Sequence, residues 1–198
     1  MWSLVIKFVK KMIIRKATIE DVNEIYNVYL LSSKAHPESL TQYADELTID
    51  YIKKEVKNSL ERGLILIAIN DKNEIVGSFK GYTSKYRKLA HIMANSTFTV
   101  LPNSEGKKGF VILFKAFIEE LKNNYQHIYK LEGIPHESNR KLVDYYLERD
   151  FVIDYELKDK IYNSTNDNFE KELIINWINP NFSMDKLKEY HKYLKTLI

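Results

Sequence analysis

The stretch Thr99–Leu121, TVLPNSEGKKGFVILFKAFIEEL, joins a strand to an amphipathic helix through a turn rich in glycine and lysine. A proline ends the strand, and the apolar residues that follow recur at helical spacing, which predicts a helix over residues 107–123. The first N–H groups of a helix lack partners within it, and the helix dipole adds positive potential there. We therefore expect unpaired N–H groups between Glu105 and Val111 that bind an anion, such as the phosphate of a cofactor.

On either side of this stretch, short apolar runs typical of strands alternate with amphipathic segments typical of helices. Three consecutive strands followed by strand-helix-strand predict an α/β fold with a mixed, mostly antiparallel sheet of about seven strands flanked by helices. The expected strands are 12–18, 64–69, 75–82, 90–101, 127–134, 151–157 and 169–177. The expected helices are 22–30, 48–62, 107–123, 138–148 and 184–197.

The chain of 198 residues, 44% of them hydrophobic, is long enough for one packed core. We expect an N-terminal extension at 1–11, one domain at 12–178 and a C-terminal helical extension at 179–198. The first eleven residues are basic and apolar but too short to span a bilayer. They form an upstream extension, an added strand or a weak amphipathic surface element.

Composition excludes several classes of chemistry. The chain has no cysteine, so disulfides, thiolate zinc sites and a cysteine nucleophile are absent. Its net charge of +3 is small and its charges are interleaved, which does not indicate nucleic-acid binding. The five histidines show no metal-ligand spacing, and there is no nucleoside triphosphate-binding loop. We expect a cytoplasmic protein with no metal, no nucleic acid and no membrane partner.

A second segment, NRKLVDYYLERDF at residues 139–151, carries a resemblance to a known family. It is similar to the pattern N-x-x-A-x-x-L-Y-x-x-x-G-F of the GNAT superfamily of acyl-CoA-dependent N-acyltransferases, with Leu142, Tyr145 and Asp150 in place of the alanine, the leucine and the glycine. The order of elements from residue 12 to about 178 also matches that superfamily. Its pyrophosphate turn reads Q/R-x-x-G-x-G/A, and residues 105–110 occupy that slot with Glu105, Lys108 and Phe110 as departures.

The resemblance implies a binding site for acetyl-CoA. The strand backbone before the turn would hold the pantetheine arm, although ordinary strand pairing would use the same groups; the residues are Phe98, Thr99, Val100 and Leu101. The turn would contact the pyrophosphate through its N–H groups, with its carboxylate pointing outward; the residues are Glu105, Gly106, Lys107, Lys108, Gly109 and Phe110. Asn139 would bind the pantetheine or cap its helix.

The resemblance also implies catalytic roles. Tyr146 lies where the family often has a tyrosine that protonates the departing thiolate, or it packs on the sheet. Some members carry a glutamate five positions before the asparagine, where this chain has Ile134. Glu132 and His136 are the nearest candidates for a proton acceptor. Alternatively, polar residues of the long strand order a water that takes the proton: His91, Asn95 and Ser96.

We therefore expect an N-acetyltransferase that moves an acetyl group from acetyl-CoA to a primary amine by direct attack in a ternary complex. The alternative is a non-catalytic CoA sensor or protein-interaction module on the same fold. The acidic segment 33–46 falls where the family builds its acceptor pocket, and it would suit an amino acid, a polyamine or a peptide N-terminus. The last helix packs on its own domain or on a second copy, which leaves a homodimer open.

Overall fold

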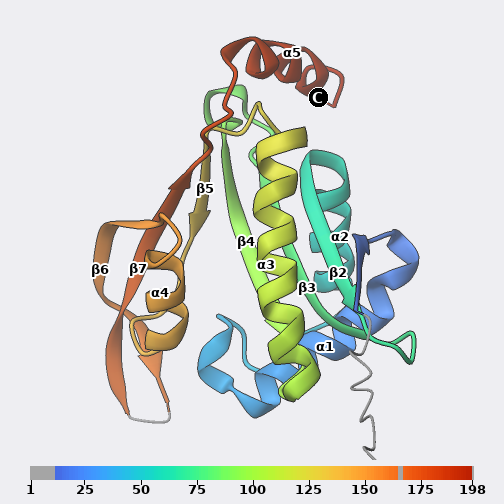
Figure 1. Ribbon diagram of the computed structural model, residues 1–198. Helices are drawn as coiled ribbons and strands as arrows, with labels where there is room; N and C mark the ends of the chain where they lie inside the picture. The colour runs from blue at the N-terminus through green and yellow to red at the C-terminus, as the bar shows by residue number, and fades with distance from the viewer. Residues whose placement is uncertain (1–11, 165–166, 198) are drawn as a thin grey trace, which may run out of the picture.

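A seven-stranded sheet forms the centre of the molecule (Figure 1), in a computed structural model that describes residues 12–164 and 167–197. The strand order is β1-β2-β3-β4-β5-β7-β6, and only the β4–β5 pair is parallel. This confirms the expected mixed, mostly antiparallel sheet, while the expected extension at 1–11 lies outside the described residues. The strands are β1 (Ile13–Lys16), β2 (Gly63–Ile69), β3 (Ile75–Thr83), β4 (Ile92–Val100), β5 (Lys130–Gly133), β6 (Val152–Asn163) and β7 (Asn168–Ile178).

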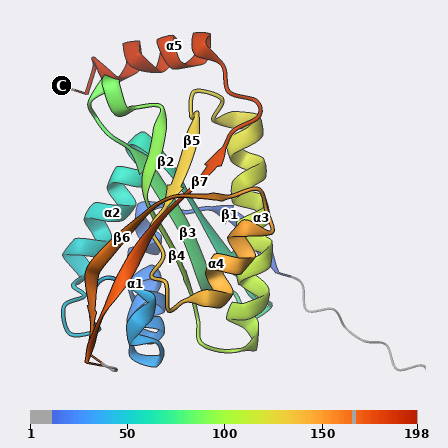
Figure 2. The same cartoon turned by 90° about the vertical axis from the view of Figure 1, so that its left-hand side faces the viewer.

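Helices cover both faces of the sheet (Figure 2). The helices are α1 (Val22–Ala35), α2 (Ile49–Arg62), α3 (Ser104–Asn124), α4 (Arg140–Leu147) and α5 (Met184–Leu194). Strand β2 is buried on both sides, because Leu64 and Leu66 pack into the core under α3 while Ile65 and Ile67 pack into the core under α1 and α2. One hydrophobic core therefore packs on each face of the sheet, one under α1 and α2 and the other under α3 and α4.

Two parts of the sheet differ in length from the expectation. Strand β5 is shorter than the expected 127–134, because a turn in which the N–H of Ile128 donates to the carbonyl of Tyr125 precedes it (2.9 Å). The β6–β7 hairpin is longer than expected and continues to the pair Asn163 and Asn168. This longer hairpin extends beyond the rest of the sheet toward the segment that follows α1 (Figure 1).

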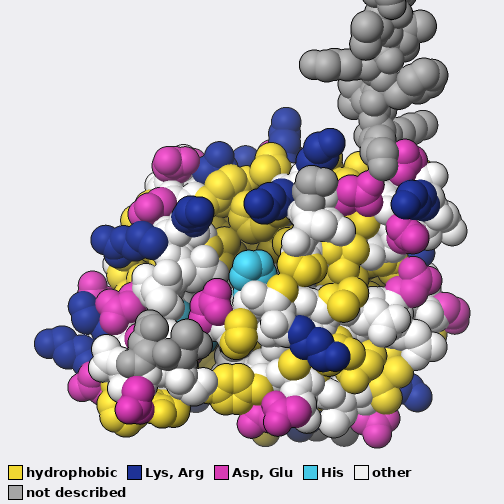
Figure 3. Space-filling model, turned by 90° about the horizontal axis from the view of Figure 1, so that it is seen from below, with side chains coloured by type: hydrophobic (Ala, Val, Ile, Leu, Met, Phe, Trp, Pro, Cys, Tyr) yellow, Lys and Arg dark blue, Asp and Glu magenta, His cyan; other side chains and the backbone are white. Residues whose placement is uncertain are grey.

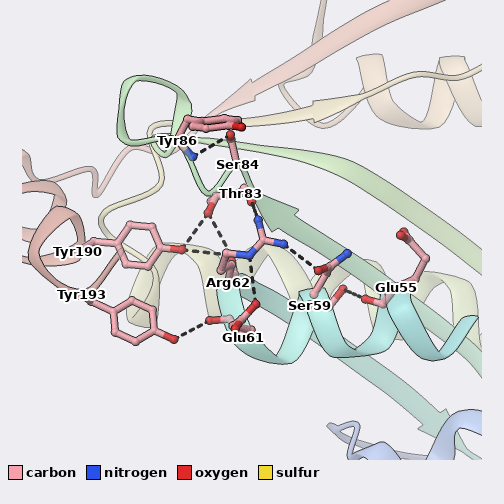
Figure 4. A network of polar contacts seen from close by, with 10 residues as sticks. Glu55, Ser59, Glu61, Arg62, Thr83, Ser84, Tyr86, Tyr190 and Tyr193 are labelled. Atoms are coloured by element: carbon pink, nitrogen blue, oxygen red, sulfur yellow. Dashed lines mark hydrogen bonds and ion pairs between the residues drawn. The ribbon is translucent and has the colours of Figure 1, made fainter. Parts of the chain in front are cut away.

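Helix α5 packs on its own domain at the carboxyl end of α2 (Figure 4). The hydroxyl of Tyr193 donates to the carbonyl of Glu61 at 3.0 Å, and that of Tyr190 lies 3.3 Å from the carbonyl of Arg62 and 2.8 Å from Thr83 Oγ1. The last carbonyls of a helix have no partner within it. The two tyrosines supply those partners, so the last helix contacts its own chain.

One consequence of this packing is a pH-dependent stability. The His127 ring lies 4.0 Å from the ring of Tyr190, centroid to centroid, and burial lowers its pKa to about 4. In the unfolded chain, the His127 ring binds a proton below about pH 6.5. In the folded chain, the ring stays neutral down to about pH 4. Between these two pH values the unfolded state binds more protons than the folded state. The free energy of unfolding should therefore decrease by about 1–3 kcal/mol in all as the pH is lowered from about 6.5 to about 4.

Urea unfolding between pH 7 and pH 4 measures this effect. The variant His127→Gln should lack this part of the decline, because it removes the titrating group and keeps a side chain of similar size. A decline of the same size in the variant and the wild type would show that His127 does not contribute.

Candidate functional site

The parallel strands β4 and β5 separate soon after they meet. They pair only at Ile92 with Lys130 and at Met93 with Leu131, and farther along the Ser96 hydroxyl donates to the carbonyl of Glu132 (2.6 Å). Beyond this point a cavity of about 150 Å³ lies between the strands. It is lined by residues of β3, β4, the segment after β5, α2, α4 and the segment 38–42, among them Tyr51, Phe79, Thr97, Phe98, Gly133, Ile134, His136, Asn139, Leu142 and Tyr146.

A bulge in β4 sets the direction of the residues that enter this cavity. Asn95 has a φ of 51°, and the register between β3 and β4 shifts at this point. Lys80 Nζ donates to the carbonyl of Asn95 at 3.0 Å, which fixes the bulged peptide. Ser96 and Thr97, directly after the bulge, both line the cavity.

Only every second residue of β4 directs its backbone N–H and C=O groups toward the cavity. The N–H of Leu101 donates to the carbonyl of Val76 in β3 (2.9 Å), so it is not available to a ligand. In an antiparallel pair the N–H and C=O groups of successive residues point to opposite sides. The groups of Phe98 and Val100 therefore face the separated strand β5, whereas those of Thr99 and Leu101 face β3. Of the four predicted residues, Phe98 and Val100 have the required orientation.

Helix α4 brings two of the predicted residues to the cavity. Asn139 occupies the N-cap position, but its side chain makes no capping hydrogen bond, so the capping alternative is not the role it has here. Tyr146 is 7% exposed, and its hydroxyl makes no hydrogen bond with another described residue. Burial raises the pKa of this phenol well above its ordinary value. The hydroxyl therefore stays protonated and can donate a hydrogen bond, although burial makes it a weaker acid than an ordinary tyrosine.

The two predicted proton acceptors lie in different places. Glu132 does not line the cavity, and its carboxylate lies 3.7 Å from Lys130 Nζ. The buried side chain of His136 lines the cavity. Of the strand residues considered as water ligands, only Ser96 lines it, because His91 precedes β4 at its far end and packs near Tyr129.

The prediction of unpaired N–H groups in the anion turn is wrong. Helix α3 begins at Ser104 rather than at residue 107, and the side chain of Asn103 caps it by accepting from the N–H groups of Glu105 (3.1 Å) and Gly106 (2.9 Å). The N–H of Lys107 donates to the carbonyl of Asn103, and the later N–H groups lie within the helix. The N–H groups expected to be unpaired are therefore already bonded.

The side chains of this turn also differ from a phosphate site. Glu105 points away from the cavity and accepts from the side-chain amide of Asn70 (2.8 Å). Lys107 and Lys108 are exposed. A Cβ on Gly106 would lie 1.9 Å from the carbonyl oxygen of Leu101, so this glycine lets α3 start close to the end of β4. Glycine at this position is explained by packing alone.

Phe110 closes the gap between α3 and α4. The centroid of its ring lies 4.5 Å from that of the Phe98 ring and 4.7 Å from that of the Tyr145 ring, and both pairs have edge-to-face geometry. The position corresponds to the second glycine or alanine of the pattern that the sequence resembles. Glycine there would leave room for a ligand, whereas Phe110 fills that room with an aromatic cluster.

Sequence reasoning missed a buried ion pair beside the cavity. Lys80 on β3 is 2% exposed and pairs with Glu55 of α2, whose other carboxylate oxygen accepts from the Tyr82 hydroxyl (3.0 Å). Burial lowers the pKa of Lys80, and the charge of Glu55 opposes this shift. A lysine inside the apolar strand IVGSFKGYT was the available signal, but its partner on α2 could not be read from the sequence.

The acidic segment after α1 only partly reaches the site. Glu38 lines the cavity, together with Ser39, Leu40 and Gln42. His36 faces Glu38 at 3.7 Å. The side chain of Glu46 accepts from the N–H of Tyr43 (2.9 Å), and neither it nor Asp45 lines the cavity. The acidity available to a ligand at this segment therefore comes from Glu38.

The described residues contain no group of three or more His, Asp or Glu placed to hold a metal ion. In the same part of the chain, no helix has both the length and the apolar character needed to cross a membrane.

Comparison with known proteins gives structural matches only. No family model and no curated protein sequence matches the chain. A putative acetyltransferase from Salmonella typhimurium, solved with its cofactor acetyl-CoA, is 12% identical with a TM-score of 0.73, covering 87% of this chain and 96% of the other. A ribosomal-protein-alanine N-acetyltransferase from Brucella melitensis is 15% identical with a TM-score of 0.70, covering 84% and 99%.

A GNAT-family acetyltransferase from Streptococcus pneumoniae is 16% identical with a TM-score of 0.70, covering 85% of this chain and 99% of the other. The chain therefore has the GNAT fold, as the sequence resemblance implied.

Proposed function

We propose that this protein transfers an acetyl group from acetyl-CoA to a primary amine in the cavity between β4 and β5. The observation that carries the proposal is the cavity itself. It lies between two separating strands and is lined by the buried residue Tyr146, whose protonated hydroxyl makes no hydrogen bond with another described residue. The acetyltransferases that share this fold, one of them solved with acetyl-CoA, support the same reaction class.

In this reaction the amine nitrogen attacks the carbonyl carbon of the thioester, a C–N bond forms and the C–S bond breaks. The nitrogen loses one proton and the sulfur gains one, so the reaction needs a proton acceptor and a donor. We assign the donor role to Tyr146. His136 is the better placed of the two predicted acceptors, because its side chain lines the cavity and that of Glu132 does not.

The two ends of acetyl-CoA fit this chain differently. The thioester end would meet the backbone of Phe98 and Val100 and the free amide of Asn139. The pyrophosphate would find the N–H groups of residues 105–107 already bonded, and the cationic groups that this turn offers are the exposed Lys107 and Lys108. We propose that the nucleotide end is held by these lysines rather than by the helix N–H groups. A location in the cytoplasm and a homodimer stay predictions.

Thiol release from acetyl-CoA across a panel of primary amines tests the function. We expect acetyl transfer to at least one amine, and mass spectrometry of the product should show one acetyl group on its nitrogen. Absence of transfer to every amine, together with absence of acetyl-CoA binding by calorimetry, would contradict it.

A second candidate function is a non-catalytic module on the same fold. The contact of Phe110 with Tyr145 and the capped start of α3 favour it, because both occupy the place where a bound nucleotide would pass. Acetyl transfer at a measurable rate would reject this candidate.

The variant Phe110→Ala tests how far the aromatic cluster restricts CoA binding. Each edge-to-face contact contributes about 0.5–1.5 kcal/mol, so the loss of two should make CoA binding about tenfold tighter if CoA must displace this ring. Isothermal titration calorimetry with CoA measures the effect, and Val111→Ala, at the exposed neighbouring position, is the control. An unchanged affinity would show that Phe110 is not in the path of CoA.

A further inference from the structure

A second cavity adjoins the first on the side away from α4. Its volume is about 230 Å³, and it lies between the segment 37–43 and the β6–β7 hairpin. Glu38, Leu40 and His136 line both cavities. The Tyr43 hydroxyl contacts Ser164 Oγ at 3.1 Å, which joins this segment to the hairpin. Figure 3 shows this end of the molecule, where a histidine lies in a hollow bordered by apolar side chains.

The polar group that distinguishes this second cavity is the carboxylate of Glu170 on β7. Glu170 lines the cavity and is 7% exposed. Its Oε1 accepts from the side-chain amide of Asn163 (2.6 Å), whereas its buried Oε2 has no hydrogen-bond partner among the described residues. A buried carboxylate oxygen without a partner is unfavourable, and a cationic donor bound beside it would remove that penalty.

The other charged groups of the cavity point to a cationic ligand. Glu38 adds a second carboxylate on the opposite wall, from the segment after α1. Lys160 is also in the lining, but it is exposed, so its ammonium group can remain in solvent while the carboxylate of Glu170 cannot. The buried part of the cavity therefore presents a negative charge that no described side chain neutralises.

We propose that this second cavity binds an ammonium group of the acceptor, so that the acceptor is a diamine or polyamine with one amine at the strand cavity and another beside Glu170. The inference rests on the proposed function for the reacting amine. The second ammonium would lie beside the Glu170 side chain, whose Oε2 would turn toward it to accept a hydrogen bond, and the Glu38 side chain lines the same cavity. A monoamine of the same length would leave this carboxylate oxygen unpaired and should bind more weakly.

Calorimetry with linear α,ω-diamines of increasing length and the matching alkyl monoamines tests the inference without acetyl-CoA. We expect at least one diamine to bind about tenfold more tightly than its monoamine, and Glu170→Gln to abolish this difference. The glutamine can still accept from Asn163, so the hairpin should fold. Glu172→Gln, two residues along β7 and outside both cavities, is the matched control and should keep the preference.

Acetylation assays on the same amines separate this inference from the function. Tighter diamine binding that depends on Glu170 supports the inference even where no acetyl transfer occurs. Equal binding and equal acetylation of diamines and monoamines would overturn the inference and leave the proposed acetyltransferase intact. An equal diamine preference in the wild type and in Glu170→Gln would also overturn it.

Discussion

Tyr146→Phe should lower the turnover of acetyl transfer by about a hundredfold or more, because a positioned proton donor contributes on the order of 10²–10⁴ to the rate. Tyr146 lines the strand cavity, and its hydroxyl makes no hydrogen bond with another described residue and has a pKa raised by burial. Its removal therefore disturbs no described contact, and the ring contacts with Phe114 and Phe151 remain. The affinity for acetyl-CoA should stay within about twofold, since the phenol acts on the leaving thiolate.

Steady-state kinetics and calorimetry on the purified variant measure these two quantities. Tyr145→Phe is the matched control, because it removes a neighbouring hydroxyl and keeps the aromatic contacts with Phe110 and Phe114. An unchanged turnover in Tyr146→Phe would remove this residue from the mechanism. A loss of turnover of the same size in Tyr145→Phe would indicate a general disturbance of α4.

The second large effect concerns stability. Lys80→Met should lower the free energy of unfolding by about 3–5 kcal/mol, because it leaves the Glu55 carboxylate buried without its counter-charge. The same substitution removes the hydrogen bond to the carbonyl of Asn95, so the β4 bulge loses its support. Equilibrium urea unfolding followed by circular dichroism measures the change.

The double variant Lys80→Met with Glu55→Met separates charge burial from packing. It removes both charges and should recover most of the lost stability, because apolar replacement of a buried pair is often neutral or better. If Lys80→Met alone cost less than about 1 kcal/mol, as is typical of a solvated surface pair, the pair would not be a buried ion pair in solution.

The sequence predicts the order of elements well because that order depends on local periodicity. The apolar stripes of α2 and α3 and the unbroken apolar run of β2 are local patterns that tertiary contacts reinforce. Asn139 and Tyr146 lie two turns apart on one short helix, and this spacing explains why both line the same cavity. Their roles at a functional site stay predictions.

The remaining features depend on contacts between distant segments. The start of α3 was misplaced because its glycine and lysines are typical of a loop, whereas Asn103 caps the helix and Gly106 permits its close approach to Leu101. The pairing of Lys80 with Glu55 and the free oxygen of Glu170 require the packed arrangement of α2 and the hairpin. Phe110 was expected to contact a pyrophosphate, and its contact with Tyr145 instead could not be foreseen because it depends on the separation of two helices.

The docking of α5 has a consequence for the order in which the molecule assembles. Tyr190 and Tyr193 reach carbonyl groups that lie 128 and 132 residues earlier in the chain. Contacts across such long loops carry a large closure entropy and form only when the intervening segments are already compact. We therefore expect the last helix to join a sheet that has already formed, so that removing its tyrosines would speed unfolding more than it slows folding.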